Sequence, residues 1–172
     1  MDTMLTLAPT PGFSPRVGSF VMMLEDVRRR LIRYVEGLTA EQLSWYPNDK
    51  AESIGTVLLH IAAVEFSYIQ EDIIRTPMGE EWKIAFPIRF GIPQVSGEGL
   101  DFYIAKLAEV RRTTLDVLKN FTDDDLLRIV QPLEPGDPTS KVEYSIEWIL
   151  YHLIEHEAHH KGQIAIMKRL LP

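Results

Sequence analysis

The stretch of sequence that decides the fold is residues 143–171, EYSIEWILYHLIEHEAHHKGQIAIMKRLL. Apolar residues recur in it at steps of three and four from Ile146 to Leu170, and it contains no proline. This pattern predicts one long helix, and Gly162 does not end it. The stretch also holds four of the chain's five histidines, which are His152, His156, His159 and His160.

Two of these histidines share one face of the predicted helix. At about 100° per residue, His156 and His160 lie roughly 40° apart and one turn above the other. The pair is expected to point inward, because its face is otherwise apolar: Ile149, Leu153, Ile164 and Met167. Two inward imidazoles one turn apart suit a metal ion. His152 and His159 fall at the edge of this arc and are expected around the site or on the surface.

The composition describes one globular domain. The chain has 172 residues, of which 45% are hydrophobic and 25% charged. Its net charge of −7 argues against broad binding to nucleic acid. The one dense basic run, Arg28-Arg29-Arg30 with Arg33, is balanced by nearby acids and is interpreted as a solvent-exposed helix face.

The chain contains no cysteine. Disulfides, thiolate zinc sites and a cysteine nucleophile are therefore excluded, and histidine and carboxylate remain as metal ligands. No stretch approaches the roughly 18 apolar residues that span a membrane. Residues 1–15 carry three prolines, lack the pattern of a signal peptide and are predicted to form a flexible arm before a single domain at 16–172. We expect a cytoplasmic protein.

Three further long helices are predicted at residues 16–37, 52–75 and 100–120. The first and third are each followed by a short capped turn, at Thr39 and Thr122. Prolines and glycines at 76–99 and 131–141 predict long irregular connections. Together these features predict an all-α fold, a four-helix bundle with long crossover connections.

The first two helices carry different apolar patterns. The first is expected to turn one stripe inward: Val17, Phe20, Met23 or Leu24, Val27, Leu31 and Tyr34. The second is apolar on several faces, which predicts either a central helix or self-association. His60 lies at the edge of its stripe, with Ser67 and Glu71 on the same side. In the following connection, Trp82, Phe86 and Phe90 either line a pocket or pin the loop to the bundle.

Two known metal motifs fit the final helix poorly. Residues 156–160, HEAHH, match the HExxH motif of zinc proteases, in which the glutamate acts as a general base. Only residues 161–172 follow, which leaves little room for a third ligand, and the extended motif fails at Gln163 and Ile166. A ferritin-like di-iron site would need a second Glu-x-x-His, but Glu65 is followed three residues later by Tyr68.

A site for a single metal ion remains possible. It would combine His156 and His160 with His60, which is the one histidine outside the final helix. Three imidazoles leave coordination positions open for water or substrate, which is typical of catalytic sites. The alternative is a cluster of histidines that only pack and form hydrogen bonds, or that respond to pH.

Three segments of the chain resemble the DinB/YfiT-like metal-binding four-helix bundles. They are Ser53-Ile54 with Leu58-Leu59-His60-Ile61-Ala62 and Glu65; EWILYH at 147–152; and HEAHHKGQI at 156–164. The resemblance covers nearly the whole chain and includes the turns at Leu38-Thr39, Trp45-Tyr46-Pro47 and Phe121-Thr122.

The resemblance implies a metal site. In that family a divalent ion, often nickel or zinc, is held by one histidine on the second helix and two histidines four residues apart on the last. It therefore implies one divalent transition metal on His60, His156 and His160, nickel or zinc first, with iron or manganese as alternatives. The family commonly forms homodimers, which the extra apolar faces of the second helix would suit.

The resemblance also implies a range of functions. Some members resemble thiol S-transferases, in which the metal activates bacillithiol, mycothiol or glutathione, and others resemble thiol-dependent isomerases. We therefore expect a metal-dependent transferase whose partners are a small-molecule thiol and an electrophilic substrate. The sequence names no general acid or base, because Glu65, Glu157 and Gln163 are all within reach and nothing in it ranks them. The alternative is a non-catalytic, dimeric metal-binding or stress-response protein, of the DNA-damage-inducible type, in which the metal is structural.

Overall fold

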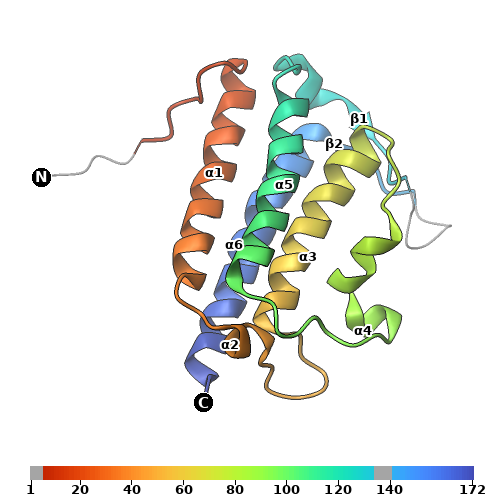
Figure 1. Ribbon diagram of the computed structural model, residues 1–172. Coiled ribbons are helices and arrows are strands. Elements are labelled where there is room, and N and C mark those ends of the chain that lie inside the picture. Colours follow the sequence, from red (N-terminus) through yellow and green to blue (C-terminus); the bar gives the residue numbers. More distant parts are fainter. Residues whose placement is uncertain (1–5, 134–140) are drawn as a thin grey trace, which may run out of the picture.

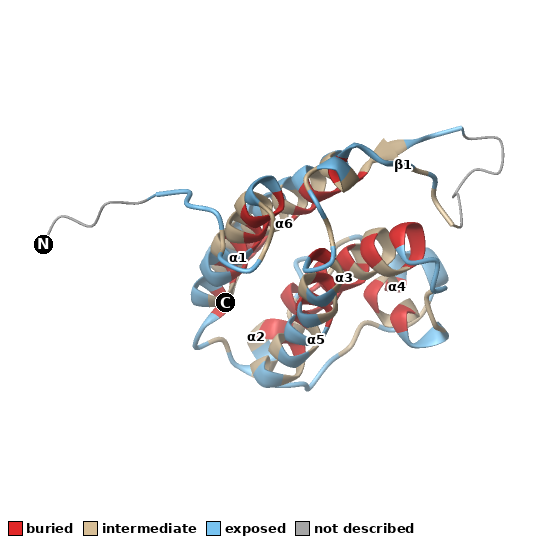
Figure 2. Cartoon of the chain, turned by 90° about the horizontal axis from the view of Figure 1, so that it is seen from above, coloured by how far each residue is buried: buried red, intermediate tan, exposed pale blue. Residues whose placement is uncertain are grey.

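The computed structural model describes residues 6–133 and 141–172, and four long helices dominate it (Figure 1). Helices α1 (Pro15–Val35) and α6 (Ile146–Leu170) pack as one layer, and α3 (Ile54–Phe66) and α5 (Leu100–Leu118) pack as the other (Figure 2). α3 also packs on α6. In the described ranges the only strands are β1 (Ile129–Val130) and β2 (Tyr144–Ser145), a short antiparallel pair. The all-α four-helix bundle is confirmed.

The connection from α3 to α5 runs back along the bundle, because these two helices point the same way (Figure 1). The connection from α1 to α3 stays at one end of the bundle, and the connection from α5 to α6 stays at the opposite end. Residues 76–99 were predicted to be irregular, but they contain a 3₁₀ helix (Glu80–Ala85) and the short helix α4 (Pro87–Phe90). The connection therefore carries ordered side chains against α3.

Both predicted capped turns are present. Thr39 and Gln42 form a reciprocal capping box at the start of α2 (Ala40–Ser44), with N–O distances of 3.3 and 3.1 Å. Thr122 and Asp125 repeat the arrangement before a 3₁₀ helix (Asp124–Leu127), with N–O distances of 2.8 and 3.4 Å. Each turn closes one end of the bundle after a long helix (Figure 1).

The buried face of α1 differs from the predicted stripe. Val21 and Val35 are buried, whereas Phe20 is half-buried and Tyr34 is 36% exposed. Val21 and Val35 therefore face inward in place of the predicted Phe20 and Tyr34, one residue later along the helix. Arg28 falls on this stripe and is 5% exposed, so its assignment to a solvent-exposed face was wrong. Arg29 and Arg30 do lie on the exposed face, where both bind Asp26.

Helix α3 is the central element of the bundle. Most residues of Ile54–Phe66 are buried within the single chain. Gly55 lets α5 approach closely, because a Cβ atom there would lie 2.5 Å from the ring of Tyr103. The apolar faces of α3 are therefore explained by burial in the bundle and do not support self-association. The homodimer stays a prediction.

After Phe66, α3 continues as a π-helix (Ser67–Ile73), which the sequence pattern did not predict. The amide of Ile74, for example, donates to the carbonyl of Ile69 at 3.1 Å, five residues back. Wider turns of this kind are frequent at functional sites. Here the wider turn changes which side chains face the neighbouring connection.

The N-terminal segment contacts the bundle within its described part. The amide of Thr10 donates to the carbonyl of Gly18 at 3.0 Å, and the hydroxyl of Ser14 donates to the carbonyl of Phe121 at 3.2 Å. Residues 1–5 of the predicted flexible arm lie outside the described residues. Within residues 6–133 and 141–172, no helix has both the length and the apolar character needed to cross a membrane.

Candidate metal centre

The structure brings together three histidines from the two central helices. Nε2 of His156 lies 3.3 Å from Nε2 of His60 and 3.1 Å from Nε2 of His160. One ring nitrogen from each residue falls within 4.8 Å of the other two. These are the three residues that the helical spacing and the family resemblance selected. We call them the histidine cluster.

Both helices that carry the cluster have well-defined starts. Ser53 caps α3 by accepting a hydrogen bond from the amide of Thr56 at 3.1 Å, and Ser145 caps α6 in the same way with Trp148, also at 3.1 Å. The predicted inward face of α6 is confirmed, because its apolar residues are all buried: Ile149, Leu153, Ile164 and Met167.

The histidine cluster is held in its neutral form. Burial, together with the neighbouring His160, lowers the pKa of His60 to about 4. Burial, with the other histidines, lowers the pKa of His156 to about 3. Burial also lowers the pKa of His160, although its hydrogen bond to Gln163 opposes the shift. Neutral imidazoles carry the lone pairs that a metal ion needs.

One hydrogen bond beside the cluster directs the lone pair of His160 inward. Nδ1 of His160 lies 2.8 Å from Oε1 of Gln163, which can only accept, so the proton of His160 lies on Nδ1 and its Nε2 presents a lone pair. Nε2 of His156 takes part in both nitrogen–nitrogen contacts, and one N–H cannot point along both. Nδ1 of His60 is buried with no hydrogen-bond partner among the described residues. Such unsatisfied groups in a core are uncommon.

The spacing of the nitrogens fits a metal ion. Tetrahedral ligands about 2.05 Å from zinc lie about 3.3 Å from each other, and ligands on one face of an octahedron at about 2.1 Å lie about 3.0 Å apart. The two observed distances, 3.1 and 3.3 Å, fall in this range. The three imidazoles could therefore hold one divalent transition metal ion with coordination positions to spare.

The other two histidines of α6 lie outside the cluster. The ring of His152 stacks on Trp148 with centroids 4.9 Å apart, meets Tyr68 edge-on at 5.2 Å, and lies 5.7 Å from His156. His159 is exposed. Their placement agrees with the prediction that they surround the site or lie on the surface.

The glutamates near the cluster are not free for proton transfer. Glu157, which stands where HExxH places a general base, binds Arg28 with an Nε–Oε1 distance of 2.7 Å. Glu65 binds Arg111 with an Nε–Oε1 distance of 2.7 Å. Burial would raise the pKa of Glu65, but Arg111 and Arg28 outweigh it and lower this pKa to about 2. The protease interpretation therefore loses its base, and only Gln163 of the three acid–base candidates contacts the cluster.

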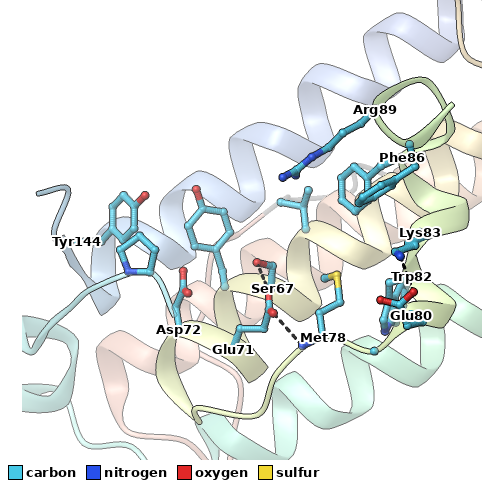
Figure 3. Close-up of a pocket in the computed structure, with 15 residues that line it drawn as sticks. Ser67, Glu71, Asp72, Met78, Glu80, Trp82, Lys83, Phe86, Arg89 and Tyr144 are labelled. Carbon is cyan, nitrogen blue, oxygen red and sulfur yellow. Dashed lines mark hydrogen bonds and ion pairs between the residues drawn. The ribbon is translucent and has the colours of Figure 1, made fainter. Parts of the chain in front are cut away.

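A cavity of about 590 Å³ lies next to the histidine cluster, and Figure 3 shows the residues that line it. Val64, one turn after His60, lines it, and Phe86 links the two because its ring meets His60 edge-on at 5.2 Å. The histidines lie beside the cavity rather than in its wall. Much of the wall is aromatic: Tyr68, Trp82, Phe86, Phe90 and Tyr144. The loop aromatics were predicted either to line a pocket or to pin the loop to the bundle. Trp82 does both, because it lines the cavity and is itself only 7% exposed.

The cavity also contains the acids Glu71 and Asp72, of which Glu71 was predicted to share the side of His60 and Asp72 was not singled out. Ser67 and Glu71 line it on the same side of the helix as His60, and Ser67 donates to Glu71 at 2.7 Å. Asp72 lies beside them (Figure 3), and burial raises its pKa, although it accepts a hydrogen bond from the amide of Leu133 at 2.8 Å. Asp72 also lies in the π-helix and lines the same cavity, which the regular helical pattern did not predict.

A four-helix bundle with three convergent histidines from α3 and α6 defines a class of candidate metal-binding proteins. The chain belongs to the DinB superfamily, whose family profile matches residues 23–164. It is 31% identical over 150 residues to the uncharacterized protein YizA of Bacillus subtilis (strain 168), covering 85% of this chain and 82% of that protein.

A solved structure supports the fold alone. It is that of an uncharacterised protein from Escherichia coli UTI89, which is 13% identical to this chain. The two structures align with a TM-score of 0.53, over 93% of this chain and 95% of the other.

Proposed function

We propose that His60, His156 and His160 bind one divalent transition metal ion and that the protein is a metal-dependent transferase acting on a low-molecular-weight thiol. The observation that carries this proposal is the convergence of three imidazole nitrogens at 3.1 and 3.3 Å. Nickel or zinc is proposed first, because neutral imidazole ligands suit both, with iron or manganese as alternatives. The thiol would be of the bacillithiol, mycothiol or glutathione type.

The chain's own residues would hold and shield the ion. His60 would anchor it to α3, and His156 and His160 would anchor it to α6. Gln163 would keep the proton of His160 away from the ion and so leave Nε2 free to bind. When bound, a divalent ion supplies a positive charge that lowers the pKa of a coordinated thiol and stabilises the thiolate.

The surroundings of the cluster support a reaction with external reactants. The chain has no cysteine, so the thiol must come from solution. The adjoining cavity of about 590 Å³ has room for a small thiol or an electrophile, and its aromatic wall would exclude water from part of it. Asp72, whose pKa is raised, is the buried carboxyl in this cavity that is best suited to exchange a proton.

A structural metal is the competing proposal. An ion on the histidine cluster would link α3 to α6, which would stabilise the bundle without any reaction. Three protein ligands and a neighbouring cavity favour the catalytic role, since structural sites are usually closed by four protein ligands. A homodimer, a cytoplasmic location and the absence of nucleic-acid partners belong to both proposals as predictions.

The deciding experiment compares metal content and thiol conjugation in the same samples. We expect about one equivalent of metal in purified protein by mass spectrometry, and loss of that metal in His60→Ala and His156→Ala, with His159→Ala as the exposed control. Metal-loaded protein should conjugate one of the three thiols to chlorodinitrobenzene or an epoxide, and chelator should abolish this. Retention of metal by both variants would exclude the site. Metal binding without conjugation of any thiol, together with a large loss of thermal stability in chelator, would favour the structural role.

A further inference from the structure

A buried ionic cluster lies where the four long helices meet. It consists of Arg28 from α1, Glu65 from α3, Arg111 from α5 and Glu157 from α6. None of the four side chains is more than 6% exposed. We call it the arginine–glutamate cluster.

Each arginine of this cluster joins both glutamates. Arg28 reaches Glu65 through Nη2 at 2.8 Å and Glu157 through Nε at 2.7 Å. Arg111 binds Glu65 through two nitrogens at 2.7 and 3.0 Å and reaches Glu157 at 3.3 Å. Nη1 of each arginine donates to a main-chain carbonyl of the facing helix, at 2.9 and 2.7 Å. α3 and α6 are thereby tied together by the other two helices.

The same two helices carry the histidine cluster. Glu65 follows His60 on α3, and Glu157 lies between His156 and His160 on α6. In this part of α6, Glu157 is the one fully buried residue between Leu153 and Ile164. The rotation of α6 about its axis at the histidines is therefore fixed by an ion pair rather than by apolar packing.

We propose that the arginine–glutamate cluster positions the histidine cluster, with Glu157 as the positioning residue that turns His156 and His160 toward His60. This inference rests on the proposed metal function. Rotation or sliding of α6 would leave buried charges unpaired, which is strongly unfavourable, whereas apolar burial is non-directional and does not by itself fix the rotation of a helix. Bidentate arginine–carboxylate contacts also fix direction as well as distance.

Glu157→Gln tests this proposal, because glutamine keeps the size of the side chain and removes its charge. We expect its affinity for zinc or nickel, measured by competition with a chromophoric chelator, to fall about 10- to 100-fold, as for other residues that orient metal ligands. The cobalt-loaded variant should also show an altered visible absorption spectrum, because the angles among the ligands change. Glu157→Asp, which keeps the charge but shortens the side chain, should lose affinity in the same direction and provides the test if Glu157→Gln does not fold.

Leu118→Ala is the matched control. Leu118 is fully buried near the end of α5 and belongs to neither cluster, so this variant should lose thermal stability but keep wild-type metal affinity and the wild-type cobalt spectrum. Wild-type affinity in the Glu157 variants would overturn the positioning role and leave the proposed function standing. An equal loss of affinity in Leu118→Ala would also overturn it, since general loosening would then explain the effect. A wild-type protein that binds none of these metals would overturn the proposed function and this inference with it.

Discussion

Two polar clusters occupy the middle of the bundle, and they are built in opposite ways. In the arginine–glutamate cluster every contact between its four side chains joins opposite charges, and the donors meet acceptors at 2.7 to 3.3 Å. In the histidine cluster like groups face one another, with nitrogen against nitrogen at 3.1 and 3.3 Å. Both clusters join α3 to α6.

This difference separates a structural group from a binding group. The arginine–glutamate cluster is complete within the chain, and its positive charges lower the pKa of Glu65. The histidine cluster has no carboxylate among its own three members, and Nε2 of His156 can form a hydrogen bond with only one of the two ring nitrogens that face it. A set of buried polar groups that the described residues do not satisfy points to a ligand from outside, whereas a satisfied set points to the fold.

The largest expected effect comes from breaking the satisfied cluster. Arg28→Ala removes the charge that faces Glu65 and Glu157 and leaves both carboxylates with Arg111 alone. We expect the free energy of unfolding to fall by about 3 to 5 kcal/mol, because buried charges lose a partner. Urea denaturation of the metal-free protein measures this loss.

Arg29→Ala provides the neighbouring control for that prediction. Arg29 is the same residue type one position along α1, but its side chain is 59% exposed and binds Asp26 at the surface. Its removal should cost less than about 1 kcal/mol. Similar losses in the two variants would show that the buried cluster contributes no more than a surface ion pair.

The two clusters should also lose stability in different ranges of pH. The pKa of Glu65 is lowered from 4.5 to about 2 in the folded chain, so its contribution is complete above pH 4.5 and is lost as the pH falls toward 2. The shift corresponds to about 3 kcal/mol. The histidine pKa values are lowered from 6.5, so the unfolded state binds protons first and stability already falls below pH 6.5.

Unfolding of chelator-treated protein between pH 8 and about 2 measures both ranges. In a His60→Gln/His156→Gln variant the fall from pH 6.5 to about 3 should become shallower, most clearly above pH 4.5 where Glu65 does not contribute, while the fall due to Glu65 below pH 4.5 remains. An unchanged profile in this variant would contradict the assignment of the upper range to the histidine cluster.

Much of the fold and the histidine cluster could be predicted from the sequence, because both depend on helical spacing. His156 and His160 share a face by periodicity, and His60 was the one histidine available from another helix. The capped turn at Thr39 followed from local chemistry that needs no tertiary contact. The HExxH match suggested a general base at Glu157, but this carboxylate pairs instead with Arg28, which lies on a distant segment of the chain.

The arginine–glutamate cluster was missed because a run of charges usually lies in solvent. A signal was present, since Arg28 continues the spacing of the buried residues Val17, Val21, Leu24, Leu31 and Val35. Arg111 lies in the same way among the buried residues of α5. An arginine on an apolar stripe predicts a buried carboxylate partner, but the identity of that partner depends on how the helices pack. The π-helix at Ser67–Ile73 was not predicted either, because a pattern of 3.6 residues per turn describes α-helices only.

The smallest expected effect comes from replacing Gln163, and it distinguishes the role of the histidine cluster from that of the arginine–glutamate cluster. Gln163 contacts the histidine cluster alone, through Nδ1 of His160 at 2.8 Å. Gln163→Ala should therefore reduce metal affinity about tenfold, near 1.4 kcal/mol, because the tautomer and ring orientation of His160 are no longer fixed. Its stability without metal should stay within about 0.5 kcal/mol of wild type, since Gln163 is only half-buried. Chelator competition and urea denaturation on the same preparations measure the two quantities. A loss of stability without a loss of affinity would assign Gln163 to the fold rather than to the metal centre.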